Sequence, residues 1–163
     1  MENIEPLFKI SKIKKSVVCL SLVMLSSCTE KERLEGRDIS LSKENTFVST
    51  AKGIVVYESN SFTEESKSDT FKIRFSTHDW DILTKSFDKN QIYTLNDDSE
   101  IGESTNSMSF PKTISIKTNK RNLSINYHYF INEKDKIDQD KSEKLKRFMR
   151  TFDSLIYYRI EKH

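Results

Sequence analysis

The sequence has few of the residues that define several specialised protein classes. Its 163 residues include three Gly and two Pro, which excludes a collagen-like or low-complexity chain. It has two cysteines, Cys19 and Cys28, and we expect them not to pair, so a disulfide-rich scaffold is excluded as well. Ten Phe, six Tyr and one Trp still provide bulky apolar side chains for a core. The length suits one compact domain with terminal appendages.

The N-terminal segment has the order of charged, apolar and small residues that is typical of a secretory signal. Four lysines precede an uncharged apolar run of about ten residues, and small residues follow it. The run is too short to cross a bilayer core, which takes about twenty residues. The alternative is a buried core helix, which would have to bury the lysine cluster beside its apolar face.

The end of this segment carries a more specific motif. Leu25-Ser26-Ser27-Cys28 resembles the lipobox of bacterial lipoproteins. The resemblance implies that residues 1–27 are a signal peptide, removed by cleavage before Cys28. It also implies that the Cys28 thiol receives a diacylglycerol and that the new amino terminus is acylated, for example with palmitate. Two or three acyl chains hold a protein durably on a membrane, whereas one holds it only marginally.

The residues after Cys28 bear on where such a lipoprotein would go. Thr29 stands where an Asp usually signals retention in the inner membrane, so the sequence resembles that of lipoproteins sent to the outer membrane, facing the periplasm. Glu30 and Glu32 resemble the acidic tags that some bacteria use for export to the cell surface. A plain solvated linker is the alternative interpretation of these two residues. The remainder of the chain is similar to small envelope lipoprotein domains of unknown role, although no motif carries that likeness.

The charge of the precursor comes from its signal. Residues 1–27 contain four of the 27 basic and two of the 25 acidic residues, so 23 of each sign remain and cancel. A nucleic-acid-binding domain would be expected to have a basic excess or a basic face. We therefore expect no nucleic-acid partner. The expected partners are the membrane, through lipid on Cys28, and an envelope protein or ligand.

Polarity divides the rest of the chain into a tether and a domain. Residues 28–38 are dense in charge and nearly free of apolar side chains, which predicts a solvated tether. We place one globular domain at residues 39–163. Residues 47–48, 53–57 and 70–76 are predicted strands from their β-branched, aromatic or alternating apolar residues. Residues 59–69 and 96–109 are predicted loops, the second long and mobile.

A helix is predicted near residues 77–88. Ser76 and Asp79 have the spacing of an N-cap and the third helical position, and Trp80, Leu83 and Phe87 share one stripe. Residues 91–95 are predicted to form a short strand.

The C-terminal third has the clearest pattern. Residues 113–118 and 123–129 alternate around a four-residue turn, which predicts a β-hairpin. A helix is predicted from about Ser142, with a single apolar stripe formed by Leu145, Phe148, Met149, Phe152, Leu155, Ile156 and Ile160. Such a stripe needs a sheet to cover. The predicted fold class is α+β, an antiparallel sheet with the C-terminal helix packed on one face.

His78-Asp79-Trp80-Asp81 is the densest cluster of side chains capable of chemistry. A His and two carboxylates could ligate a metal or act as acid and base. The alternative, which we favour, is that Asp79 stabilises the helix N-terminus and Trp80 packs in the core.

The other candidates carry weaker signals. His128 should lie on the strand face opposite Tyr127 and Tyr129, half-exposed, and His163 is the last residue. Asp97-Asp98-Ser99-Glu100 lacks the spacing of a calcium loop. Phosphate-binding Gly-rich loops, nucleophile elbows and His-Glu-x-x-His motifs are absent from the sequence. We expect no catalytic residue, no metal and no cofactor, so Cys28, as the lipidated residue, is the one predicted site.

Two function classes remain open. The first, which the lack of motifs favours, is a non-enzymatic envelope lipoprotein that acts as a binding or interaction module. The alternative is a small envelope enzyme, such as a hydrolase, with an active site that no motif marks. A pocket that gathers His78, Asp79 and a further titratable group would favour the enzyme.

Overall fold

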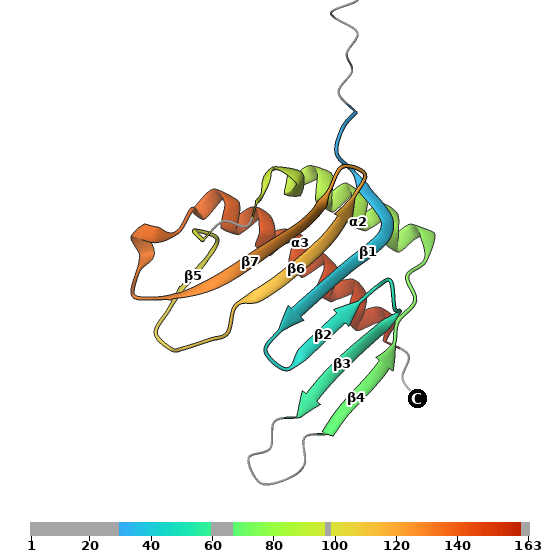
Figure 1. The fold of residues 1–163 in the computed structure, drawn as a ribbon, viewed down its shortest axis with the longest axis horizontal. Helices are drawn as coiled ribbons and strands as arrows, with labels where there is room; N and C mark the ends of the chain where they lie inside the picture. Colours follow the sequence, from blue (N-terminus) through green and yellow to red (C-terminus); the bar gives the residue numbers. More distant parts are fainter. Residues whose placement is uncertain (1–29, 60–66, 97–98, 161–163) are drawn as a thin grey trace, which may run out of the picture. The chain divides into compact units, whose positions relative to one another are not determined.

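The domain is a two-layer α+β structure, as the sequence predicts. The computed structural model describes residues 30–59, 67–96 and 99–160, and Glu32 onward belongs to one compact unit. Seven strands form one sheet, and helices α2 and α3 lie on the same face of it (Figure 1). The strands are β1 Leu34–Lys43, β2 Thr46–Ser49, β3 Ile54–Ser59, β4 Lys67–Lys72, β5 Gly102–Thr105, β6 Lys112–Thr118 and β7 Asn122–Ile131.

The strand order is β4-β3-β2-β1-β6-β7-β5. Strands β1 to β4 form an antiparallel meander, and β6 and β7 form the predicted hairpin. The two groups join where β1 pairs with β6, with Leu41 opposite Ile114. Strand β5 is the exception, because it pairs in parallel with β7.

Each long helix begins at a side-chain cap. Helix α2, Thr77–Lys89, starts at Ser76, whose hydroxyl accepts from the amide of Asp79. Helix α3, Gln139–Arg159, starts at Asp138, whose carboxylate accepts from the amide of Lys141. These bonds satisfy amides that have no partner inside the helix. Two short 3-10 helices, η1 Ile92–Thr94 and η2 Lys134–Lys136, complete the elements.

The core lies between the sheet and the two helices. Alternate strand residues point into it, because successive side chains of a strand point to opposite faces. The buried apolar side chains from the strands include Ile39, Leu41, Val48, Val55, Ile114, Ile116, Leu123 and Ile125. The helices contribute Trp80, Leu83, Phe87, Leu145, Phe148, Met149, Phe152, Leu155 and Ile156. Phe87 meets Phe148 edge to face, with ring centroids 6.2 Å apart, which holds α2 against α3.

The opposite face of the sheet is covered by neither α2 nor α3 (Figure 1). The strand register places Ser40 beside both Ser49 and Ser115, and Ser115 beside Ser124. These four serines form a row across the open face. Among the described residues, no helix is both long and apolar enough to span a membrane.

Several predicted elements are confirmed. The helix near residues 77–88 is α2, and the strands at 47–48 and 53–57 are β2 and β3. The C-terminal helix is confirmed but starts at Gln139, three residues before Ser142, because Asp138 supplies the cap. The strand predicted at 70–76 ends at Lys72 instead, after which Ile73 forms an isolated bridge with Ile160. The signal peptide and Cys28 lie outside the described residues, as do residues 60–66 of the predicted first loop.

The tether prediction was wrong for residues 34–38, which belong to β1. Leu34 pairs with Thr118 of β6, and the register shifts between Leu34 and Ile39. Glu32 and Arg33 are also fixed, through bonds to the β6–β7 turn described below. Backbone pairing, which charged side chains do not prevent, therefore extends the domain to Glu32.

Two further predictions were wrong. The strand predicted at 91–95 is instead the 3-10 helix η1, Ile92–Thr94, because Gln91 adopts a left-handed backbone with φ +52° that turns the chain out of α2. Residues 102–105, inside the predicted loop 96–109, form strand β5. Gly102 lets β5 approach β7 closely, since a Cβ there would collide with the carbonyl of His128.

Candidate functional site

A bulge in β1 creates an unusual backbone position at Arg37. Its φ is +53°, in the left-handed region that non-glycine residues seldom adopt. The Thr50 hydroxyl, from the β2–β3 turn, donates to the Arg37 carbonyl oxygen at 2.9 Å. The same hydroxyl accepts from the Ile39 amide at 2.8 Å. Thr50 thus holds a conformation that costs an isolated residue about 1–2 kcal/mol.

Arg37 lines a pocket of about 360 Å³ between the bulge, the β2–β3 turn and the segment that joins β4 to α2. Of its other basic lining residues, Lys52 belongs to the turn and Arg74 to the segment before α2. Phe75 and Trp80 supply aromatic surface, with ring centroids 5.5 Å apart. We call this site, defined by Arg37, Lys52, Arg74, Phe75 and Trp80, the basic pocket.

The basic pocket has a surplus of positive charge. None of the described residues that line it is acidic. The Arg37 guanidinium carbon lies 6.0 Å from the Trp80 ring centroid, and the Lys52 ammonium lies 6.0 Å from that of Phe47. Within the described part of the chain, no carboxylate forms an ion pair with Arg37, Lys52 or Arg74. The site therefore attracts anions.

Asp79 stands next to Trp80 in the sequence, yet its carboxylate is already engaged. It is buried and accepts from the Ser76 amide at 2.7 Å and the Ser76 hydroxyl at 2.8 Å. Arg159, at the end of α3, donates through Nε at 2.9 Å and Nη2 at 3.0 Å. Burial by itself would raise the pKa of Asp79, but the hydrogen bonds from Arg159 and Ser76 outweigh it and lower the pKa. The predicted capping role of Asp79 and the core position of Trp80 are confirmed.

The rest of the His78-to-Asp81 cluster does not form a site. His78 and Asp81 are exposed on α2, and neither lines the basic pocket. His128 is half-exposed on the face opposite Tyr127, as predicted, and its ring lies 5.9 Å from that of Phe130. In the described ranges, no three His, Cys, Asp or Glu side chains come together as they would around a metal ion. His163 and Asp97-Asp98 lie outside those ranges.

A second polar cluster connects β5, β7 and α3. Lys146 donates to Glu103 at 2.7 Å, and the Tyr127 hydroxyl donates to the same carboxylate at 3.2 Å. The hydrogen bond from Lys146 lowers the pKa of Glu103, while burial and the nearby carboxylate raise the pKa of Tyr127. Glu103 thus stays ionised and Tyr127 stays protonated, and these are the forms that bond to each other. This is the behaviour of a structural cluster.

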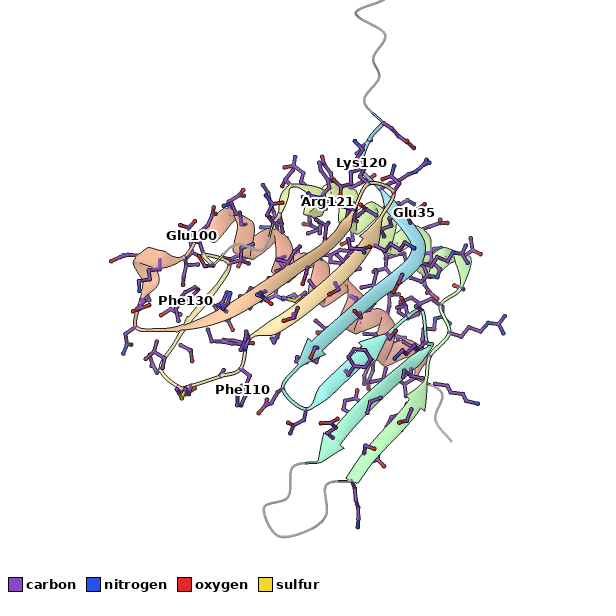
Figure 2. All side chains as sticks on the ribbon, viewed as in Figure 1. Glu35, Glu100, Phe110, Lys120, Arg121 and Phe130 are labelled. Atoms are coloured by element: carbon purple, nitrogen blue, oxygen red, sulfur yellow. The ribbon has the colours of Figure 1, made fainter. Side chains whose placement is uncertain are left out.

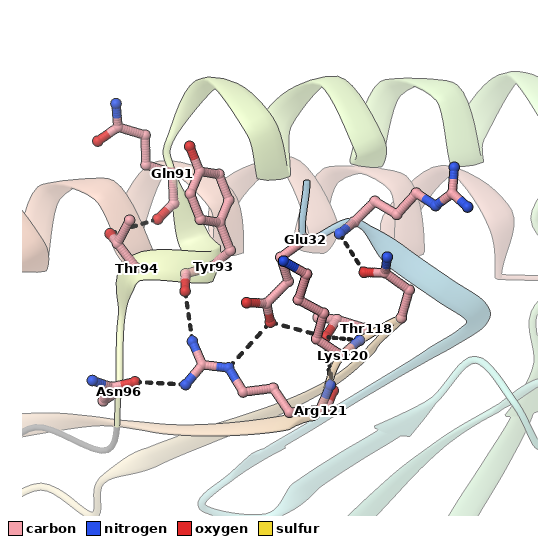
Figure 3. A network of polar contacts seen from close by, with 10 residues as sticks. Glu32, Gln91, Tyr93, Thr94, Asn96, Thr118, Lys120 and Arg121 are labelled. Atoms are coloured by element: carbon pink, nitrogen blue, oxygen red, sulfur yellow. Dashed lines mark hydrogen bonds and ion pairs between the residues drawn. The ribbon is translucent and has the colours of Figure 1, made fainter. Parts of the chain in front are cut away.

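A third polar network fixes the entry of the chain into the domain (Figure 3). Glu32 accepts from the Thr118 hydroxyl at 2.9 Å and from Arg121 Nε at 3.1 Å. Arg121 also donates to Asn96 at 2.9 Å and to the Tyr93 carbonyl oxygen at 2.6 Å. One guanidinium thus joins the β6–β7 turn, the segment before β1 and the segment around η1.

The three cations of the basic pocket were not among the predicted site residues. Arg37 fell in the predicted tether and Arg74 in the strand predicted at 70–76, while Lys52 stands in the β2–β3 turn, and no characteristic spacing links them. Gly53 is the one local sequence feature that points to this region. Its φ of +65° marks a tight turn beside Lys52.

Comparisons with known proteins found no matching family model, no matching curated protein and no matching solved structure.

Proposed function

We propose that this chain is an envelope lipoprotein, anchored through lipid on Cys28, whose domain serves as a binding module. One observation carries the anchor: Leu25-Ser26-Ser27-Cys28 ends an apolar run that follows a lysine cluster. Lipid on Cys28 would hold the protein at the outer membrane, with the domain facing the periplasm.

The proposed anchor point is close in the sequence to the start of the domain. Three residues separate Cys28 from Glu32, the first side chain bonded to the β6–β7 turn. The four intervening Cα–Cα steps can span about 14 Å at most. In this proposal the end of the domain that carries Lys120 and Arg121 stays near the lipid headgroups (Figure 2).

The side chains favour binding over catalysis. Asp79 and Glu103, two carboxylates whose pKa values are lowered by their surroundings, are engaged in ion pairs that hold elements together. The basic pocket, by contrast, offers charge and aromatic surface to a ligand. A concave site with a few convergent polar groups is the usual form of a small-molecule site.

The anchor is tested by substituting the two cysteines separately. Cys28→Ser should abolish incorporation of labelled palmitate and leave the signal uncleaved, as detected by mass spectrometry. Cys19→Ser is the matched control, because Cys19 lies within the same segment but outside the lipobox, and it should be processed normally. Wild-type protein with an unmodified Cys28 thiol, or equal lipid incorporation by both variants, would overturn the proposal.

A further inference from the structure

We infer that the basic pocket binds a small phosphate ester. This inference deepens the proposal of a binding module and does not depend on the lipid anchor. The ligand class follows from three features of the pocket: its charge, its apolar wall and the strained backbone at Arg37.

The basic residues of the pocket favour a ligand with more negative charge than a single carboxylate carries. Arg37, Lys52 and Arg74 all line this pocket of about 360 Å³, and none of its described lining residues is acidic. A phosphate monoester carries about −1.5 to −2 at neutral pH and offers three acceptor oxygens, whereas a carboxylate carries one charge. Guanidinium groups donate paired hydrogen bonds to phosphate, so the two arginines suit this partner.

The apolar side chains of the pocket favour a phosphate that carries an organic group. Ile73, Phe75 and Trp80 line the same pocket as the three cations. A fully hydrated inorganic ion would gain nothing from these side chains, while the carbon skeleton of an ester would remove them from water. The pocket volume lies within the range of about 300–1,000 Å³ that is common for small-ligand sites.

The backbone at Arg37 indicates that its position matters. A left-handed φ at a non-glycine residue is costly, and such residues gather where a ligand is held. The Thr50 hydroxyl fixes this backbone on both sides of the bulge. The result is a guanidinium that projects to Trp80 at the pocket wall.

Trp80 makes the test direct, because it is the only Trp of the chain. The full-length protein in a non-ionic detergent is titrated with glycerol 3-phosphate, and binding is followed by Trp80 fluorescence and by calorimetry. We expect saturable binding, which strengthens from pH 5 to 7.5 as the phosphate loses its second proton near pH 6. Glycerol and acetate should leave the fluorescence unchanged.

Three variants locate the site. Arg37→Gly, Lys52→Gln and Arg74→Gln should each weaken binding about tenfold or more, since each removes a charge-assisted contact. Glycine suits the positive φ at residue 37, so Arg37→Gly should fold, as circular dichroism would verify. Lys134→Gln is the matched control, because Lys134 is exposed on η2, beyond the β7 side of the sheet, and it should bind like the wild type.

A second titration separates a free ester from a lipid headgroup. Micelles doped with phosphatidic acid, whose headgroup is a phosphate monoester, are compared with micelles doped with phosphatidylcholine, in the wild type and in Arg37→Gly. Binding of glycerol 3-phosphate, or of phosphatidic acid alone with the same dependence on Arg37, supports the site and shows whether the ester is free or part of a lipid. The inference is overturned if neither probe saturates, if acetate binds as well, or if Lys134→Gln weakens binding as much as Arg37→Gly. Lipidation of Cys28 does not enter the measurement, so the two proposals can fail independently.

Discussion

The ion pair between Asp79 and Arg159 joins the start of α2 to the end of α3, and its contribution to stability can be measured with a double-mutant cycle. Arg159→Gln removes the charge and keeps much of the side-chain length, while Asp79→Asn keeps the shape of the cap. The Asp79 side chain is 2% exposed and the Arg159 side chain 43% exposed. The pair therefore lies between a surface ion pair and a fully buried one.

This intermediate exposure sets the expected magnitude. A surface pair contributes about 0–1 kcal/mol, and breaking a fully buried pair costs about 3–5 kcal/mol. We expect Arg159→Gln to lower the free energy of unfolding by about 1.5–3 kcal/mol, the range for hydrogen bonds to charged groups. Asp79→Asn should cost a similar amount plus about 0.3–1 kcal/mol, because it also removes a negative charge from the helix N-terminus.

The pH dependence provides a sharper test of the same reasoning. The pKa of Asp79 is lowered in the folded state, so its stabilisation is present above the unfolded pKa of about 4 and is lost as the pH falls through the folded pKa. The stability difference between wild type and Arg159→Gln should therefore shrink as the pH is lowered from 7 to 3. The pKa values of Glu103 and Asp138 are also lowered, so protonating them in acid destabilises the fold as well. That loss of stability is the same in the wild type and in Arg159→Gln, and it cancels when the two are compared.

The assay is urea unfolding of the four proteins at pH 7, 5, 4 and 3, followed by circular dichroism. A coupling energy of about 1 kcal/mol or more at pH 7, which becomes smaller as the pH falls to 3, is the expected result. A stability gap that stays constant from pH 7 to 3 would refute the reasoning, because it would show that Arg159 acts through packing and not through the Asp79 charge.

Three further predictions concern the fold. Phe152→Ala should cost about 3–5 kcal/mol, since Phe152 is fully buried on α3, whereas Phe110→Ala, at a side chain that is 72% exposed, should leave the urea midpoint unchanged. A chain that begins at Ile39 should be less stable than one that begins at Glu30 by at least about 2 kcal/mol. It lacks two hydrogen bonds to Glu32, each contributing about 1 kcal/mol. Equal melting temperatures of the two chains would show that the polar network around Glu32 and Arg121 is dispensable. Gly102→Ala should lower stability by about 1–3 kcal/mol through overpacking, and full stability in thermal unfolding would contradict the close approach of β5 to β7.

The parts of the fold that could be predicted are those with a local pattern. The stripe that includes Phe148 and Phe152 recurs at steps of three and four, so it identified α3 and its buried face. The spacing of Ser76 and Asp79 identified the start of α2 for the same reason, because the cap forms within one turn.

The parts that could not be predicted depend on partners far away in the sequence. Residues 34–38 carry charges like those of a linker, and they form a strand only because β6 provides the backbone groups that pair with it. Gly102 belongs to β5 because β7 lies alongside. The basic pocket is the extreme case, since Arg37 and Arg74 come together only after the meander has folded.

The pairing of β1 with β6 has a consequence for how the chain folds. The meander β1 to β4 is local and can form before the rest of the chain is available, but β6 lies on the far side of α2 in the sequence. Until β6 arrives, the inner edge of β1 presents unpaired backbone groups between Ile39 and Leu41, and such an edge readily joins other chains. A chain whose N-terminal part folds first therefore passes through a stage in which β1 to β4 exist with an open edge. Closure at this pairing should be the slow step of folding, and chaperones that bind extended segments would act in that interval.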